Sequence, residues 1–228
     1  MKVLVVVATE LEGRLLADEL NFECEIEKNR SRYWFDDLVI DILSTGVGVI
    51  FTTFHLTRTL LKYQYEIVLN IGLGRSFSKK IEIGEVLNIV TEEFADLGIE
   101  KYSGFKSLFD LGYLPKNEFP FEKGIINNST VSTNLGLPIA KGITVNKTYG
   151  RSSMLEELSS KFDAEVESME GAAIFYVCKN ISVPFLELRA ISNYVEPREF
   201  SNWNIPLALS NLNVAVFQVL SKLNVVVT

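Results

Sequence analysis

Residues 166–193 read VESMEGAAIFYVCKNISVPFLELRAISN and hold three structural signals in direct succession. A short strand pattern, AEVESM at 164–169, leads into GAAIFYVCKN, which is largely apolar, as in a buried helix. The run VPFLELRAIS that follows is typical of a buried strand. Strand, helix and strand in this order indicate an α/β domain. An acidic residue, Glu170, stands where the helix is expected to begin.

The rest of the chain continues this alternation. Apolar runs bounded by turn residues predict strands at 3–8, 65–74, 83–98 and 141–146, and a hairpin at 33–44. Helix-period segments predict helices at 10–20, 50–63, 152–162 and 206–222. The stretch 101–128 is rich in Phe, Gly and Pro without a sustained period, and predicts a long functional or interface loop. We therefore expect an α/β fold, a three-layer α/β/α single domain over residues 1–228 with a central mixed sheet.

The composition excludes several classes of partner. Over 228 residues the formal net charge is −7, whereas binding to nucleic acid or to an acidic membrane surface needs a basic face. The single histidine, His55, excludes a metal site built from several histidines. The two cysteines, Cys24 and Cys178, have no metal or redox spacing and are expected to be buried thiols. We expect no metal, no organic cofactor, no nucleic-acid partner and no membrane partner.

The N-terminus MKVLVVVATE carries an apolar run that is too short for the core of a signal peptide or for a membrane-spanning helix. No other stretch is long and apolar enough to span a bilayer. We therefore expect a cytoplasmic protein.

Glycines and polar residues stand where several predicted strands end. They are Glu10, Glu12, Gly72, Gly74, Glu170 and Asn193. Taken singly, each has a structural explanation, because acidic residues stabilise a helix start and an Asn after a strand is ordinary turn chemistry. Ligands of α/β folds, however, gather at the carboxyl ends of strands. Two carboxylates and an amide at such an edge can cleave a glycosidic bond. One carboxylate activates water, the other favours an oxocarbenium-like transition state, and the amide holds the departing base.

The stretch at 166–193 resembles the signature region of the purine nucleoside phosphorylase and nucleosidase superfamily. The opening VVVATELEGRLL is similar to the start of the nucleosidases, and STGVGV and NIGLGRSF match the two glycine segments in order. The resemblance implies that Glu12 activates water, that Glu170 binds the ribose hydroxyls and that Met169 lies beneath the sugar. It further implies that Asn193 contacts the leaving base and that Gly72 lies against the substrate. A helix start would keep the Glu170 carboxylate ionised, and a plain capping role for Glu170 stays open.

Asn193 indicates which base is released. Adenine-releasing nucleosidases have Asp at this place, whereas an Asn can accept from a protonated N7 through its oxygen and donate to a 6-oxo group through its nitrogen. Those are the edge groups of hypoxanthine. A 6-amino group would face the amide NH2, donor against donor, unless the amide flips, and such mispairing costs roughly 1–3 kcal/mol. The sequence therefore favours an inosine-like substrate, with a structural turn role for Asn193 as the alternative.

The segment NYVEPREFSNWNIPLA at 193–208 looks like the corresponding segment of futalosine hydrolases, which release hypoxanthine from futalosine in an alternative menaquinone pathway. EFADLG and GFKSLFDLG also resemble that group. Futalosine carries an aromatic carboxylate beyond its ribose. We therefore expect an aromatic wall from Trp203 and Phe105, and a cation from Arg75 or Arg198. Trp203 as a core residue and Arg198 as a surface residue are the ordinary alternatives.

Some positions depart from the superfamily pattern. Leu73 stands where the nucleosidases have Ser, and Arg75 stands at a glycine, where its cation either reaches a substrate carboxylate or points to solvent. Asn70 stands where the phosphorylases place a phosphate-binding Arg, which favours water over phosphate as the nucleophile. Tyr149 lies near the place where the superfamily stacks an aromatic ring on the base.

These features together predict a nucleosidase that hydrolyses futalosine to hypoxanthine and the dehypoxanthinyl sugar. The alternatives are a methylthioadenosine/S-adenosylhomocysteine nucleosidase, a purine nucleoside phosphorylase and a non-catalytic nucleoside sensor. The presence of both Glu12 and Glu170 disfavours a sensor, because binding alone needs no water-activating base. The resemblance also implies a homodimer or a higher homo-oligomer, in which the Phe-rich loop at Lys101–Phe121 closes a neighbour's site.

Overall fold

The structure, a computed structural model, describes residues 1–102, 104–128, 135–148, 152–196 and 203–225. Within these ranges the helices are α1 (Glu10–Glu19), α2 (Val49–Lys62), α3 (Ser152–Lys161), α4 (Gly171–Ile181) and α5 (Ile205–Val225). The strands are β1 (Lys2–Val7), β2 (Asn21–Glu27), β3 (Arg30–Phe35), β4 (Leu38–Ser44), β5 (Ile67–Ser76), β6 (Val86–Phe94), β7 (Gly98–Lys101), β8 (Gly104–Ser107), β9 (Ile126–Asn127), β10 (Ile139–Thr144), β11 (Val166–Ser168) and β12 (Phe185–Tyr194).

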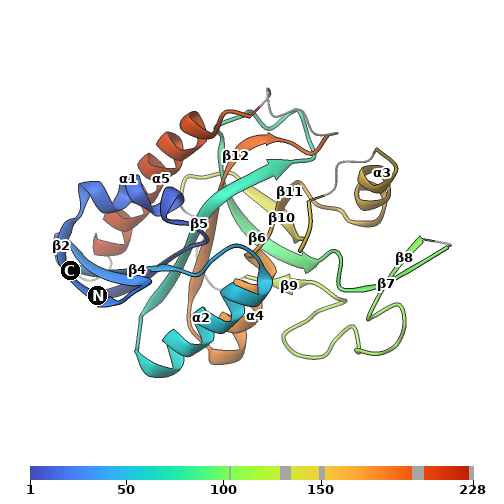
Figure 1. Cartoon of the computed structure of the whole chain (residues 1–228), viewed down its shortest axis with the longest axis horizontal. Coiled ribbons are helices and arrows are strands. Elements are labelled where there is room, and N and C mark those ends of the chain that lie inside the picture. Colours follow the sequence, from blue (N-terminus) through green and yellow to red (C-terminus); the bar gives the residue numbers. More distant parts are fainter. Residues whose placement is uncertain (103, 129–134, 149–151, 197–202, 226–228) are drawn as a thin grey trace.

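A mixed sheet forms the middle of the molecule (Figure 1). Its strands follow the order β11-β10-β6-β12-β5-β1-β4-β3-β2, and β9 adds to β6. The central strands β4, β1, β5 and β12 run parallel to one another, so their carboxyl ends meet at one edge. Their nearly continuous apolar sequences are those of strands that are covered on both faces.

The strand β11, at one end of the strand order, also pairs with the central strand β5. β11 pairs with β10 in parallel and with β5 in antiparallel orientation, where Val166 faces Ser76 and Glu167 faces Arg75. The strands β5, β12, β6, β10 and β11 therefore close into a ring. This closure brings the turn that follows β11 beside the carboxyl ends of β5 and β12.

Helices cover both faces of the sheet. β1 sends Val3, Val5 and Val7 to one face, where they pack with α1 and α5, and it sends Leu4 and Val6 to the other, where they pack with α2 and α4. This division follows from the period of two along a strand. Figure 1 shows α1 and α5 on one side of the sheet and α2 and α4 on the other. The expected three-layer α/β/α arrangement with a mixed central sheet is confirmed.

Most predicted elements are present, and the structure differs from the sequence prediction at three points. The range 101–128 is not a plain loop, because β8 pairs with β7 in a hairpin that projects from the sheet in Figure 1, and β9 joins β6. The edge strand β2 was not predicted, since most of its residues are exposed. Cys178 is buried as expected, whereas Cys24 is exposed because it lies on this edge strand. Within the described ranges, none of the helices has both the length and the apolar character that crossing a bilayer requires.

Candidate active site

A pocket of about 310 Å³ opens at the carboxyl edge of the sheet. The first turn of α1, the end of β5, the turn between β11 and α4, and the end of β12 supply its walls. Six of the predicted site residues line it: Glu12, Arg75, Met169, Glu170, Asn193 and Trp203. These residues are far apart in the sequence, and they meet because parallel strands present their carboxyl ends together.

Glu12 is held in place by three hydrogen bonds. Its Oε2 accepts from the Thr9 N–H at 3.0 Å and from the Thr9 hydroxyl at 3.1 Å, in the capping box of α1. Its Oε1 accepts from the Leu73 N–H of β5 at 3.1 Å. The side chain is only partly buried. Glu12 thus supports the start of α1 and also presents a fixed carboxylate to the pocket.

Glu170 precedes α4, but within the described residues its side chain makes no capping hydrogen bond. Ser168 Oγ accepts from the Gly171 N–H instead, at 3.1 Å. Glu170 Oε1 accepts from the Gly48 N–H at 2.9 Å, and Oε2 lies 3.6 Å from Arg189 Nη1. Glu170 therefore does not cap α4 through a side-chain hydrogen bond, although it stands at the N-cap position of the helix. Burial raises the pKa of the Glu170 carboxyl, and the Arg189 guanidinium and the Gly48 N–H oppose this rise.

Arg189, which was not predicted as a site residue, lies in the middle of β12 and is buried. Its Nε donates to Glu187 Oε1 at 2.6 Å, and its Nη2 donates to Asn70 Oδ1 at 2.7 Å. The third nitrogen, Nη1, faces Glu170. The sequence FLELRAIS could have indicated this residue, because Glu187 and Arg189 are charged and stand inside an otherwise apolar strand. Buried charges of this kind need partners.

Gly72 lies beside Arg189 in the pairing of β5 with β12, and it is not among the residues that line the pocket. A Cβ at Gly72 would stand 2.4 Å from Arg189 Nη1 and 2.8 Å from Glu12 Oε1. Any side chain there would displace both charged groups. The glycine therefore lets Glu12 and Arg189 approach the same point of β5.

Asn193 is buried at the end of β12 and holds its amide in one orientation. Its Oδ1 accepts from the Ser192 hydroxyl at 2.8 Å, and its Nδ2 donates to the Tyr194 carbonyl at 3.0 Å. A flipped amide would set Oδ1 against the Tyr194 carbonyl, acceptor against acceptor. Beyond these contacts with described residues, the amide has one further N–H and one further lone pair for a ligand.

Arg75 and Trp203 both line the pocket. Arg75 is buried, and its Nη1 donates to Glu167 Oε1 at 2.8 Å across the β5–β11 pairing that closes the ring. The solvent-facing alternative for Arg75 is therefore wrong. Trp203 is only partly buried where it lines the pocket, so it is not the core residue that the ordinary alternative describes.

Of the remaining predicted residues, the structure describes Phe105. Phe105 lies on β8 and lines a separate small hollow beside α3, where Lys161 Nζ stands 4.5 Å from the centre of its ring. Tyr149 and Arg198 lie outside the described residues.

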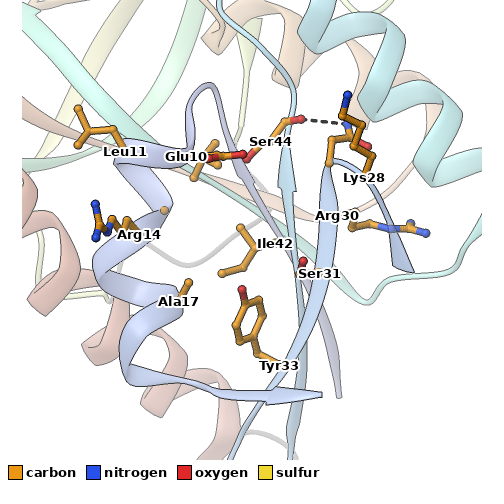
Figure 2. A pocket seen from close by; sticks show the side chains of 13 residues that line it. Glu10, Leu11, Arg14, Ala17, Lys28, Arg30, Ser31, Tyr33, Ile42 and Ser44 are labelled. Atoms are coloured by element: carbon orange, nitrogen blue, oxygen red, sulfur yellow. Dashed lines mark hydrogen bonds between the residues drawn. The ribbon is translucent and has the colours of Figure 1, made fainter. Parts of the chain in front are cut away.

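A second and larger hollow, of about 530 Å³, borders the same turn of α1 (Figure 2). It lies between α1 and the strands β3 and β4, and Figure 2 shows Glu10 close to Ser44 at one end and Tyr33 beneath Ile42. Leu11 is the single described residue that lines both hollows. Glu10 therefore belongs to a different hollow from Glu12, although only one residue separates them.

Comparisons with known proteins identify the family. The family profile described as "Phosphorylase superfamily" matches residues 2–221. A futalosine hydrolase from Streptomyces coelicolor is 32% identical over 152 residues, which are 67% of this chain and 64% of that protein. A futalosine hydrolase from Thermus thermophilus is 30% identical over 183 residues, 79% of this chain and 80% of that protein. A 5'-methylthioadenosine/S-adenosylhomocysteine nucleosidase from Colwellia psychrerythraea, solved with adenine, aligns at a TM-score of 0.80 and 18% identity, covering 97% of this chain and 95% of that chain.

The matches agree with the resemblance seen in the sequence. These two relatives are named futalosine hydrolases, so the expectation that the chain is related to N-glycosyl hydrolases is confirmed. The solved structure has the same fold. Because the family profile covers nearly the whole chain, this protein belongs to the phosphorylase superfamily.

Proposed function

We propose that this protein is a nucleosidase that hydrolyses futalosine to hypoxanthine and the dehypoxanthinyl sugar. The observation that carries the proposal is that Glu12, Glu170 and Asn193 line one pocket at the carboxyl edge of the sheet. The futalosine hydrolases at 32% and 30% identity support the choice of substrate.

Glu12 is the general base in this proposal. The Thr9 and Leu73 N–H groups fix its two oxygens, and further lone pairs remain for a water molecule. Glu12 takes a proton from this water as the water oxygen bonds to the anomeric carbon of the ribose. The glycosidic C–N bond breaks in the same step, its electron pair leaves with the purine, and N7 of the purine takes a proton from solvent water. Glu12 returns the proton of the attacking water to solvent after cleavage, which balances the step.

Glu170 binds the ribose hydroxyls and stabilises the positive charge that develops on the sugar. Its effect is strong because the carboxylate is buried, where opposite charges attract more than in water. Arg189 prevents Glu170 from being an isolated buried charge. Met169 supplies the apolar surface beneath the sugar.

Asn193 receives the departing base. Its oxygen accepts from the N7–H of the leaving purine, and its remaining N–H donates to the 6-oxo group of hypoxanthine. The contact with the Tyr194 carbonyl supports this assignment because it opposes the flip that adenine would require. A methylthioadenosine/S-adenosylhomocysteine nucleosidase is the second candidate, since such an enzyme from Exiguobacterium is 24% identical over 94% of this chain. The Asn193 amide disfavours it.

Beyond the ribose, the aromatic ring of futalosine packs against Trp203 and its carboxylate binds a cation. Arg75 lines the pocket but pairs with Glu167, so a substrate carboxylate would share this cation with the protein's own carboxylate. Arg198 is the other candidate cation, and Tyr149 is the candidate ring on the base.

A homodimer is the second part of the proposal. α2 exposes Ile50, Phe51, Phe54 and Leu61, and Val47 connects this apolar face to the rim of the pocket. Exposed apolar patches of this kind mark protein interfaces. In the dimer, Phe105 and its neighbours in the Phe-rich segment would come from the second copy.

Phe54→Glu should convert the dimer to a monomer, because it places a charge in the middle of the apolar face of α2. Light scattering of the purified protein measures this. Gln218→Glu on α5 adds the same charge to the other helical layer and should leave the mass unchanged. A monomeric wild-type protein would contradict the dimer.

Glu12→Gln should lower kcat by about 10²–10⁴-fold, because the amide cannot accept the proton of the attacking water. Glu10→Gln is the matched control, since Glu10 lies on the same helical turn but lines the other hollow. It should retain wild-type kcat. Release of hypoxanthine from futalosine is the readout, and equal losses in the two variants would refute the assignment of Glu12.

Asn193→Asp should change which base the enzyme releases. An aspartate carboxylate accepts from a 6-amino group and repels a 6-oxo group. The ratio of kcat/KM for inosine-type over adenosine-type substrates should fall about tenfold or more. Parallel assays with both substrate types measure the ratio, and an unchanged ratio would mean that Asn193 does not read the base.

A further inference from the structure

Behind the pocket, three glutamates surround one arginine. Glu92 lies on β6, Glu187 lies on β12, and Glu170 precedes α4; with Arg189 all four side chains are at most 5% exposed. Arg189 bonds to Glu187 at 2.6 Å and lies 3.6 Å from Glu170. Three ionised carboxylates against one guanidinium would leave two uncompensated negative charges in a dry interior, which costs far more than protonating one of them.

Glu92 and Glu187 converge on one backbone point. A Cβ built on Gly171 would stand 2.2 Å from Glu92 Oε1 and 2.6 Å from Glu187 Oε1. A Cβ on Gly142 would likewise stand 2.3 Å from Glu92 Oε1. The two glycines therefore make room for the Glu92 carboxyl group beside that of Glu187. Buried carboxylates this close to each other do not both ionise.

The hydrogen bonds indicate which of the two carries the proton. Glu187 Oε1 accepts from Arg189 Nε, as an ionised carboxylate does. Glu92 Oε2 accepts from the Thr144 hydroxyl at 2.8 Å, and Thr144 Oγ1 in turn accepts from the Ala172 N–H at 2.7 Å. Glu92 Oε1 is then the oxygen left to carry a proton. Glu187 Oε2 is buried without a hydrogen-bond partner among the described residues and is left to accept one.

Both members of the pair connect to the residue that binds the ribose. Glu187 holds Arg189, which faces Glu170. Glu92 acts through Thr144 on the first turn of α4, directly after Glu170. The two paths thus reach the carboxylate and the backbone of the same ribose-binding turn.

We propose that Glu92 and Glu187 form a carboxylic acid–carboxylate pair that shares one proton and acts as a positioning unit for Glu170. The proposal rests on the function proposed above for Glu170, and neither member of the pair lines the substrate pocket. The shared proton keeps the cluster near charge balance, so that Arg189 is not drawn away from Glu170. Loss of the proton sets two carboxylates against each other beneath α4 and displaces the turn that carries Glu170.

The surroundings of Glu92 agree with a retained proton. Four described groups act on Glu92: Glu187 and Arg189 from β12, Thr144 from β10, and Glu170 before α4. The negative charge of Glu12 on α1 in turn raises the pKa of Glu170. Burial raises the pKa of Glu92 well above its usual range, and the negative charge of Glu187 raises it further. Thr144 and Arg189 oppose this rise without reversing it.

The sign of the stability effect follows from this direction. A carboxyl group whose pKa is raised by folding stabilises the folded state fully below the pKa of the unfolded chain. That contribution is lost as the pH rises toward the folded-state pKa. In this window the unfolding equilibrium constant of the wild type should rise by up to about tenfold per pH unit through Glu92.

Glu92→Gln tests the pair. The amide has the same shape, its oxygen accepts from Thr144, and its NH2 donates to Glu187, but it has no proton to lose. The variant should remain active at pH 7, and the alkaline limb of its pH–kcat/KM profile should move upward by about one pH unit or more. Urea unfolding across the same pH range should show a flatter dependence than in the wild type. Glu93→Gln, the neighbouring residue on β6 outside the cluster, is the matched control and should keep the wild-type alkaline limb.

The two readouts separate the proposals. An unchanged dependence of stability on pH in Glu92→Gln would mean that Glu92 is ionised in the folded protein, and would overturn the pair whether or not futalosine is the substrate. If Glu92→Gln flattens the dependence of stability on pH but leaves the alkaline limb of the kcat/KM profile where it is in the wild type, the positioning role is overturned. If the variant does not fold, infrared spectroscopy of the wild type at pH 7 decides, since a buried protonated carboxyl band supports the pair and its absence refutes it. Absence of any hydrolysis by the wild type refutes the proposed function, while the stability and infrared readouts still test the proton.

Discussion

The buried guanidinium of Arg189 is the interaction on which the candidate site depends. A fully buried positive charge is tolerated only with partners, and here three different elements supply them. Glu187 on β12, Asn70 on β5 and Glu170 before α4 each face a different nitrogen of Arg189. Gly72 leaves the space in which the side chain lies. Arg189 therefore connects β5 and β12 to the turn that carries Glu170.

Glu12 and Glu170 are the same kind of residue in different surroundings, and this difference suits the two roles proposed for them. Glu12 is partly exposed and held by the Thr9 and Leu73 N–H groups, which leaves it open to a water molecule. Glu170 is buried, near a cation and a backbone donor, and burial raises the pKa of its carboxyl. A base that exchanges protons with water needs the first environment, and a charge that stabilises a cationic transition state is most effective in the second.

Much of the fold was predictable because its signals are local. The run VLVVV has the apolar character of a strand covered on both faces, and its alternate residues enter the two cores of the structure. The features that were missed depend on pairing between distant segments. The Arg75–Glu167 ion pair exists only because β11 closes onto β5 in antiparallel orientation, and no sequence pattern near either residue predicts that closure. Cys24 is exposed because β2 lies at the edge of the sheet, which is again a property of strand order. Arg189 is a different case, because FLELRAIS predicts an apolar strand from local pattern alone, while its two charged residues require partners that other strands supply.

The central claim is that this pocket uses water to release hypoxanthine from futalosine. Purified protein incubated in phosphate-free buffer with futalosine, inosine and methylthioadenosine, followed by liquid chromatography of the products, tests it most directly. Rapid release of hypoxanthine from futalosine, without phosphate and well ahead of the other two substrates, is the result that the account predicts. Release of adenine from methylthioadenosine in preference, or a requirement for phosphate, would contradict it.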